Sequence, residues 1–145
     1  MKLILAQALI VLAALASFAQ SDAQKAKIAD DIRAVMTKQA ADWNRGDIPA
    51  FMEGYWKSDQ LTFVSTRVTK GWQPTLENYK KSYPDKAAMG VLTFSDLEIT
   101  VISKDAAVVL GSWSLQREKD KPGGKFTLIF RKFKEGWRII HDHTS

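Results

Sequence analysis

The chain has 145 residues, of which 46% are hydrophobic, and it carries a formal net charge of +5. This length is typical of one domain, and the hydrophobic content is sufficient for a buried core. The sequence contains no cysteine, which excludes disulfides, thiol nucleophiles and cysteine-ligated metal sites. Because basic and acidic residues are interspersed along the chain, its composition gives no support to a nucleic-acid-binding function.

The first nineteen residues differ from the rest of the chain. Lys2 is followed by an apolar run of about fourteen residues, and the small residues Ser17 and Ala19 come next. A basic start, an apolar run and small residues in this order are typical of an export signal. The run is too short to span a bilayer comfortably. A buried N-terminal helix or an uncleaved anchor is the alternative.

We therefore expect residues 1–19 to be a signal peptide and residues 20–145 to be a single domain. Cleavage after Ala19 fits the pattern best, and Ala16 or Ala23 are alternatives. The expected location is periplasmic or secreted, without membrane contact after cleavage.

Three helices are expected in the first half of the domain. Apolar residues recur there at steps of three and four, the pattern of one long amphipathic helix. Gly46 is placed to end this helix, Asp47 to cap the next, and Pro49 fits a first helical turn. The predicted helices span Asp22–Arg45, Ile48–Trp56 and Pro74–Tyr83.

Strands are expected to follow. Residues Leu61–Thr69 are rich in β-branched side chains and end at a turn at Lys70-Gly71. Further turn residues divide the last third of the chain into a meander. The predicted strands span Leu61–Thr69, Val91–Ile102, Ala106–Arg117, Lys125–Lys132 and Trp137–Thr144. Helices followed by hairpins predict an α+β domain, with the helices packed on one face of a curved sheet.

Several segments are similar to one known superfamily. Ala41–Phe51 resembles the Trp-Asn-x-Gly-Asp corner of the SnoaL-like and ketosteroid-isomerase-like branches of the nuclear transport factor 2-like superfamily. Lys70–Trp72 resembles the glycine before their third helix, and Ala106–Trp113 their central strand. Gly136–Ser145 resembles their closing strand, and also that of the calcium/calmodulin-dependent kinase II association domain. The resemblance extends over roughly residues 25–145.

This resemblance implies a cone-shaped α+β fold. One long helix and two short helices would pack on a strongly curved antiparallel sheet and leave an apolar cavity open at one end. The resemblance further implies a small apolar molecule as ligand, a homodimer and no cofactor. Because the superfamily includes isomerases, cyclases, dehydratases and binding or assembly modules, the fold alone does not define the function.

The closing strand carries the candidate catalytic residues. Strict strand alternation places His141 and His143 on the face of Ile139, and Asp142 and Thr144 on the opposite face. Histidines facing the cavity would form a general acid/base pair, since imidazole titrates near neutral pH. An inward Asp142 would have a raised pKa and could shuttle a proton. The resemblance to the kinase association domain implies that Asp142 and Thr144 face inward, and the histidines could instead have only structural contacts.

Aromatic residues are the candidate ligand contacts. The resemblance implies that Trp43, Tyr79 and Trp113 lie near the cavity, where a hydroxyl or an indole N–H could orient a ligand. Phe130 and Thr144 complete the predicted contacts, although buried aromatic residues more often serve the core. No metal site is expected, since two histidines separated by one residue have no motif for a third ligand.

Two classes of function remain open. One is a small-molecule-binding module without catalysis, and the other is a SnoaL-like isomerase, cyclase or lyase with Asp142, His141 or His143 as general acid or base. Residues 61–65, which match the segment that carries the base in the ketosteroid isomerase branch, contain no acid. The absence of a second acid/base partner slightly favours binding.

Overall fold

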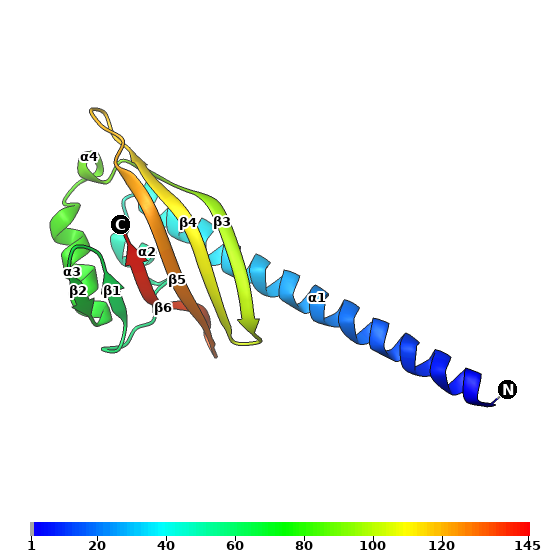
Figure 1. Ribbon diagram of the computed structural model, residues 1–145. Coiled ribbons are helices and arrows are strands. Elements are labelled where there is room, and N and C mark those ends of the chain that lie inside the picture. Colours follow the sequence, from blue (N-terminus) through cyan, green and yellow to red (C-terminus); the bar gives the residue numbers. More distant parts are fainter. Residues whose placement is uncertain (1) are drawn as a thin grey trace.

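The computed structural model describes residues 2–145, with the side chains of residues 21–145 (Figure 1). The helices are α1 (Lys2–Asn44), α2 (Ile48–Met52), α3 (Trp72–Ser82) and α4 (Lys86–Met89). The strands are β1 (Thr62–Val64), β2 (Val68–Lys70), β3 (Val91–Ser103), β4 (Ala106–Gln116), β5 (Gly123–Phe133) and β6 (Gly136–Thr144). The predicted α+β class is confirmed.

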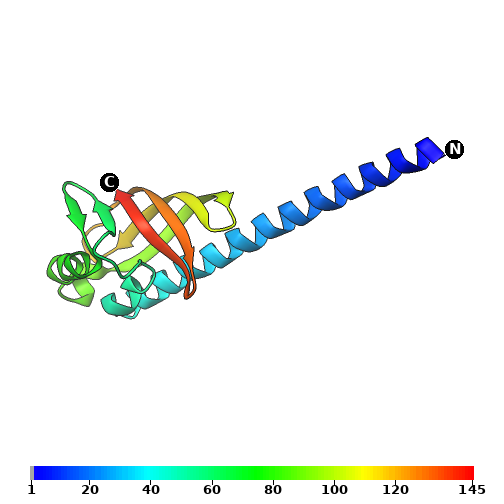
Figure 2. The ribbon, with the colours of Figure 1, turned by 90° about the horizontal axis from the view of Figure 1, so that it is seen from below.

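One six-stranded sheet organises the domain, in the order β2-β1-β6-β5-β4-β3. Strands β3 to β6 form the predicted antiparallel meander, whereas β1 pairs with β6 in parallel. The sheet curves beside the C-terminal part of α1, and α2 and α3 lie near its β1–β2 end (Figure 2). The core fills the space between α1 and the inner face of the sheet, where Ile32, Met36 and Val109 are almost fully buried.

The first helix is longer than expected from the sequence. It begins at Lys2 rather than near Asp22, and its N-terminal part projects beyond the sheet (Figures 1 and 2). The reason is local, because the leucines and alanines of this segment have high helix propensity. Residues 2–19 of the expected signal peptide form the start of this helix, while Met1 lies outside the described residues. Among the described residues, no helix is long and apolar enough to cross a membrane.

The corner between α1 and α2 has the predicted caps. Gly46 has a φ of 88°, which favours glycine, and it lies two residues after Asn44, the last residue of α1. The Asp47 carboxylate accepts a hydrogen bond from the backbone N–H of Ala50 at 2.9 Å and so caps α2.

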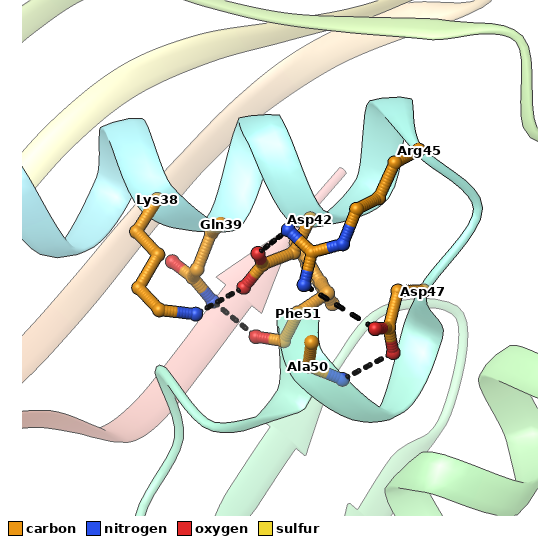
Figure 3. Close-up of polar contacts among 7 residues, drawn as sticks. All are labelled: Lys38, Gln39, Asp42, Arg45, Asp47, Ala50 and Phe51. Carbon is orange, nitrogen blue, oxygen red and sulfur yellow. Dashed lines mark hydrogen bonds and ion pairs between the residues drawn. The ribbon is translucent and has the colours of Figure 1, made fainter.

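Polar side chains hold this corner together (Figure 3). Asp42 is 1% exposed, and its carboxylate accepts hydrogen bonds from Lys38, at 2.7 Å, and from Arg45. Gln39, one turn earlier on α1, donates through Nε2 to the carbonyl oxygen of Phe51 at 3.2 Å. The buried acid is thereby paired with two cations, and α2 is fixed against α1.

The end of α1 is also joined to the start of β3. The Asn44 side chain donates to the carbonyl oxygen of Leu92 at 3.1 Å and accepts from its N–H at 2.7 Å. The indole N–H of Trp43 donates to the carbonyl oxygen of Met89 at 3.2 Å. The Trp-Asn pair of the corner therefore determines how the long helix meets the sheet.

Several predicted boundaries were wrong. The segment predicted as one strand over Leu61–Thr69 is a hairpin of β1 and β2, with a turn closed by a 3.0 Å hydrogen bond from the Ser65 N–H to the carbonyl oxygen of Arg67. The turn Ser65-Thr66-Arg67 contains none of the residues Gly, Pro, Asn or Asp that usually mark one. Helix α2 ends at Met52 instead of Trp56, and the short α4 was not expected.

Candidate functional site

A cavity of about 720 Å³ lies inside the cone formed by the helices and the sheet. Its walls come from the end of α1, from α2, α3 and the β1–β2 hairpin, and from the inner faces of β3 to β6. Cavities of this size accommodate small organic molecules of drug-like dimensions. It is lined by a mixture of aromatic, aliphatic and polar residues.

Aromatic rings from the helices and from β1 form one wall of the cavity. Phe51 and Tyr79 are in edge contact, with ring centroids 5.4 Å apart, and Phe63 contacts Tyr79 at 5.7 Å. Trp43 packs edge-on against both Phe51, at 5.2 Å, and Tyr83, at 4.8 Å. Rings held edge to face by several neighbours have little freedom, so this wall is a preformed apolar surface.

One carboxyl group lies within this apolar surface. Asp142 is 3% exposed, and the Tyr55 hydroxyl donates a hydrogen bond to its Oδ2 at 2.7 Å. The Thr144 hydroxyl donates to its Oδ1. Asp142 is thus the acidic side chain of the cavity lining, and both of its oxygens are hydrogen-bonded.

A β-bulge in β6 aims Asp142 into the cavity. In the pairing with β5, Ile129 lies opposite His141 and Phe130 lies opposite Ile139, so Ile140 is the extra residue. The expectation that Ile139 shares a face with His141 was wrong, because strict alternation does not hold across a bulge. Ile139 and Asp142 both face inward as a result, and both line the cavity.

The segment after α2 places Tyr55 against this strand. The N–H of Trp56 donates to the carbonyl oxygen of Ile139 at 2.9 Å. The N–H of Ile139 donates in turn to the carbonyl oxygen of Gly54 at 2.9 Å. This short bridge runs parallel to β6 immediately before the bulge. The backbone therefore fixes the distance between the Tyr55 hydroxyl and the Asp142 carboxylate.

Burial determines the electrostatics of the pair. Loss of hydration raises the pKa of Asp142 from 3.8 to about 6, although the hydrogen bonds from Thr144 and Tyr55 and the charge of His143 oppose the shift. Burial also raises the pKa of Tyr55 and of Tyr79 well above 10, and the negative charge of Asp142 adds to both shifts. Asp142 can therefore exchange a proton near neutral pH while both phenols remain protonated donors.

Four of the predicted ligand contacts line the cavity: Trp43, Tyr79, Trp113 and Thr144. The proposed use of an indole N–H to orient a ligand was wrong for both tryptophans. The N–H of Trp43 is bonded to a backbone carbonyl, and that of Trp113 donates to a main-chain oxygen of Ser145 at 3.2 Å. Both tryptophans therefore contribute apolar ring surface to the cavity lining.

The other predicted site residues lie elsewhere. Phe130 has no exposed surface and is a core residue outside the cavity lining. His141 is partly buried on the outward side of the bulge and does not line the cavity, whereas His143 is exposed and contributes to its rim. Of the three candidate catalytic residues, the structure thus places Asp142 in the interior and His143 at the mouth.

Two residues of the site were missed from the sequence. Tyr55 was not among the predicted ligand contacts, although a buried tyrosine hydroxyl requires a hydrogen-bond partner, which was the available signal. Arg67 was expected on an ordinary strand, but it lies at the turn of the hairpin and lines the cavity mouth. Among the described side chains, no cluster of three or more His, Cys, Asp or Glu residues could hold a metal ion.

Comparison with known proteins agrees with this architecture. The family model of the SnoaL-like domain matches residues 32–145. The chain therefore belongs to the SnoaL-like domain family, whose fold is that of the nuclear transport factor 2 (NTF2)-like proteins. No curated protein matches the sequence.

Solved structures include a similar NTF2-like protein of unknown function from Shewanella oneidensis, 45% identical, with a TM-score of 0.78 over 81% of this chain and 98% of that one. An NTF2-like protein from Salmonella enterica is 20% identical, with a TM-score of 0.67 over 83% and 91% of the two chains. A putative calcium/calmodulin-dependent kinase II association domain from Xanthomonas campestris is 16% identical, with a TM-score of 0.60 over 79% and 84%. These last two similarities concern the fold alone.

Proposed function

We propose that this protein binds a small, largely apolar molecule that carries a hydrogen-bonding group such as a carbonyl or hydroxyl. The observation that carries the proposal is the buried Asp142 carboxyl in an aromatic-lined cavity of about 720 Å³. A buried polar group inside an apolar pocket is the usual arrangement by which a binding site orients its ligand. The rigid aromatic wall supplies affinity, and Asp142 supplies orientation.

Phenylnaphthylamine, a neutral apolar dye that fluoresces in apolar surroundings, tests this proposal directly. Ser82 is exposed and lines the cavity mouth, so Ser82→Trp should obstruct the cavity without filling the core. The matched control is Ser103→Trp, at an exposed serine outside the cavity lining. We expect saturable binding to the wild type and the control, and loss of binding in Ser82→Trp. Equal binding by all three proteins would refute the cavity as the binding site.

A co-purified natural ligand would extend the result. Native mass spectrometry of the purified protein, followed by denaturation, compares the intact mass before and after release of any bound molecule. We expect an additional mass in the wild type that is absent from Ser82→Trp, because the same obstruction excludes both dye and ligand.

Acid/base catalysis is the second candidate function, and the observation that favours it is the pKa of about 6 of Asp142 beside the Tyr55 donor. Asp142 would take a proton from the carbon next to a carbonyl and return it, while Tyr55 hydrogen-bonds the carboxyl group. Exchange of the methyl protons of acetophenone in heavy water, followed by NMR, tests this chemistry. We expect faster exchange with the wild type than with Asp142→Asn, and equal rates would argue for binding alone.

We further propose that the protein is exported. The support is the order of Lys2, an apolar run and small residues within residues 1–19. N-terminal sequencing of protein recovered outside the cytoplasm should begin near Gln20. A soluble cytoplasmic product that retains Met1 would contradict export.

We also propose a homodimer. The support is apolar surface on β3 and the neighbouring β4, where Val91, Ile102 and Leu110 are 54%, 63% and 44% exposed. Burying such surface against a second copy is the common solution for a single sheet covered on one face. Light scattering at micromolar concentration should give twice the chain mass, and a single-chain mass would refute the dimer.

A further inference from the structure

The mouth of the cavity carries a guanidinium without an acidic partner. Arg67 lies at the turn between β1 and β2, is exposed and lines the cavity. Within residues 21–145, it takes part in no salt bridge. A lysine or arginine on the outer surface needs no partner other than water. Arg67 differs because it lies at the entrance of a cavity.

Neighbouring side chains hold Arg67 in place. One of its terminal nitrogens donates to the Oδ1 of Asn78 on α3 at 3.1 Å. Asn78 in turn donates through Nδ2 to the hydroxyl of Thr69 on β2 at 3.2 Å. Both Asn78 and Thr69 line the cavity as well. Because this contact uses only part of the guanidinium, its remaining N–H groups are available to an oxyanion.

Charge is separated along the cavity. Among the described residues that line it, Arg67 and His143 are the side chains able to carry positive charge, and Asp142 is the acidic one. Both side chains are exposed at the mouth, and the hairpin that carries Arg67 lies beside β6 because Val64 pairs with His143. Asp142 is buried in the interior. A negatively charged ligand group would be attracted to the mouth by Arg67 and repelled from the interior by an ionised Asp142.

We propose that the ligand is an amphipathic organic anion, whose carboxylate or similar oxyanion binds Arg67 at the mouth while its apolar body occupies the aromatic interior. This inference rests on the proposed function and narrows its ligand class. The anion supplies the acidic partner that Arg67 lacks, and planar oxyanions match the guanidinium geometry. A carbonyl or hydroxyl at the far end of the ligand would then face Asp142.

Two dyes with the same ring system separate this inference from the proposed function. Phenylnaphthylamine is neutral, and anilinonaphthalenesulfonate has the same two aromatic parts with one added sulfonate. Arg67→Gln removes the charge while retaining a polar stem. The matched control is Lys70→Gln, at an exposed cation of the same hairpin that does not line the cavity. Fluorescence titration gives a Kd for each dye and protein.

We expect Arg67→Gln to weaken anilinonaphthalenesulfonate binding about fivefold, as befits one partly exposed charge-assisted contact. Phenylnaphthylamine binding should remain unchanged, and Lys70→Gln should leave both dyes unaffected. Unchanged sulfonate binding in Arg67→Gln, or equal weakening of both dyes, would overturn the inference while leaving the proposed function intact. Failure of phenylnaphthylamine to bind the wild type would refute the proposed function, and the inference with it.

Discussion

Replacing Asp142 with Asn should change how the stability of the protein depends on pH. The folded protein holds the Asp142 proton with a pKa of about 6, against an ordinary value of 3.8. Between these two values the folded state binds more protons than the unfolded state, so stability falls as the pH rises. The difference in pKa corresponds to about 3 kcal/mol of unfolding free energy, lost between about pH 4 and pH 7. An amide is neutral throughout this range and should not show the loss.

Urea denaturation of the wild type and Asp142→Asn from about pH 4 to pH 8 measures this effect. Subtracting the two curves removes the contributions of the titrating groups that do not interact with Asp142. We expect the variant to gain up to about 3 kcal/mol relative to the wild type over this window, with the gain complete above about pH 7. The matched control is Asp59→Asn, which removes one exposed carboxylate.

A flat difference curve would refute the argument, because Asp142 would then have the same proton affinity in the folded and unfolded states. Because the charge of His143 lowers the pKa of Asp142, the pair should also be compared in a His143→Gln background. In the His143→Gln background, we expect the stability of the protein that retains Asp142 to keep falling to a higher pH than in the wild type.

Three further predictions concern single contacts. Tyr55→Phe removes a donor that lowers the pKa of Asp142, so the same pH transition should move to higher pH, with a loss of about 1 kcal/mol in unfolding free energy; an unmoved transition would contradict the pairing. Asn44→Ala leaves the N–H and carbonyl of Leu92 without their partner. Urea denaturation should show a loss of about 2 kcal/mol in unfolding free energy, and an unchanged urea midpoint would contradict this expectation. Asp142→Asn should weaken phenylnaphthylamine binding about fivefold, whereas His141→Gln should leave it unchanged because His141 lies outside the cavity lining. The reverse order would mean that the face of β6 that carries His141 forms the binding site.

The elements with strong local signals could be predicted from the sequence. Gly46 and Asp47 form the predicted corner, and the meander follows the turn residues between its strands. The hairpin of β1 and β2 could not be predicted, since its turn depends on pairing with β6 rather than on Ser65 and Arg67 themselves. Local sequence does not contain that tertiary contact.

The candidate site was predictable only in part. Asp142 attracts attention as an acid in an apolar closing strand, but its direction depends on the extra residue Ile140, which no turn or glycine signal marks. Tyr55 is 87 residues away from Asp142 in the sequence, and their hydrogen bond exists only because the segment after α2 pairs with β6. Residue types therefore indicated the chemistry, and backbone pairing determined which groups meet.

The contact between Asn44 and Leu92 also bears on aggregation. β3 is an edge strand, and an edge with free N–H and carbonyl groups is a template on which another chain can add a strand. The Asn44 amide occupies both backbone groups of Leu92, as a neighbouring strand would. Farther along, the register of β3 shifts between Ser95 and Glu98, and Asp96 there has a φ of 53°. A helix terminus and a charged bulge thus interrupt the row of free backbone groups along this edge, which hinders another chain from adding a strand there.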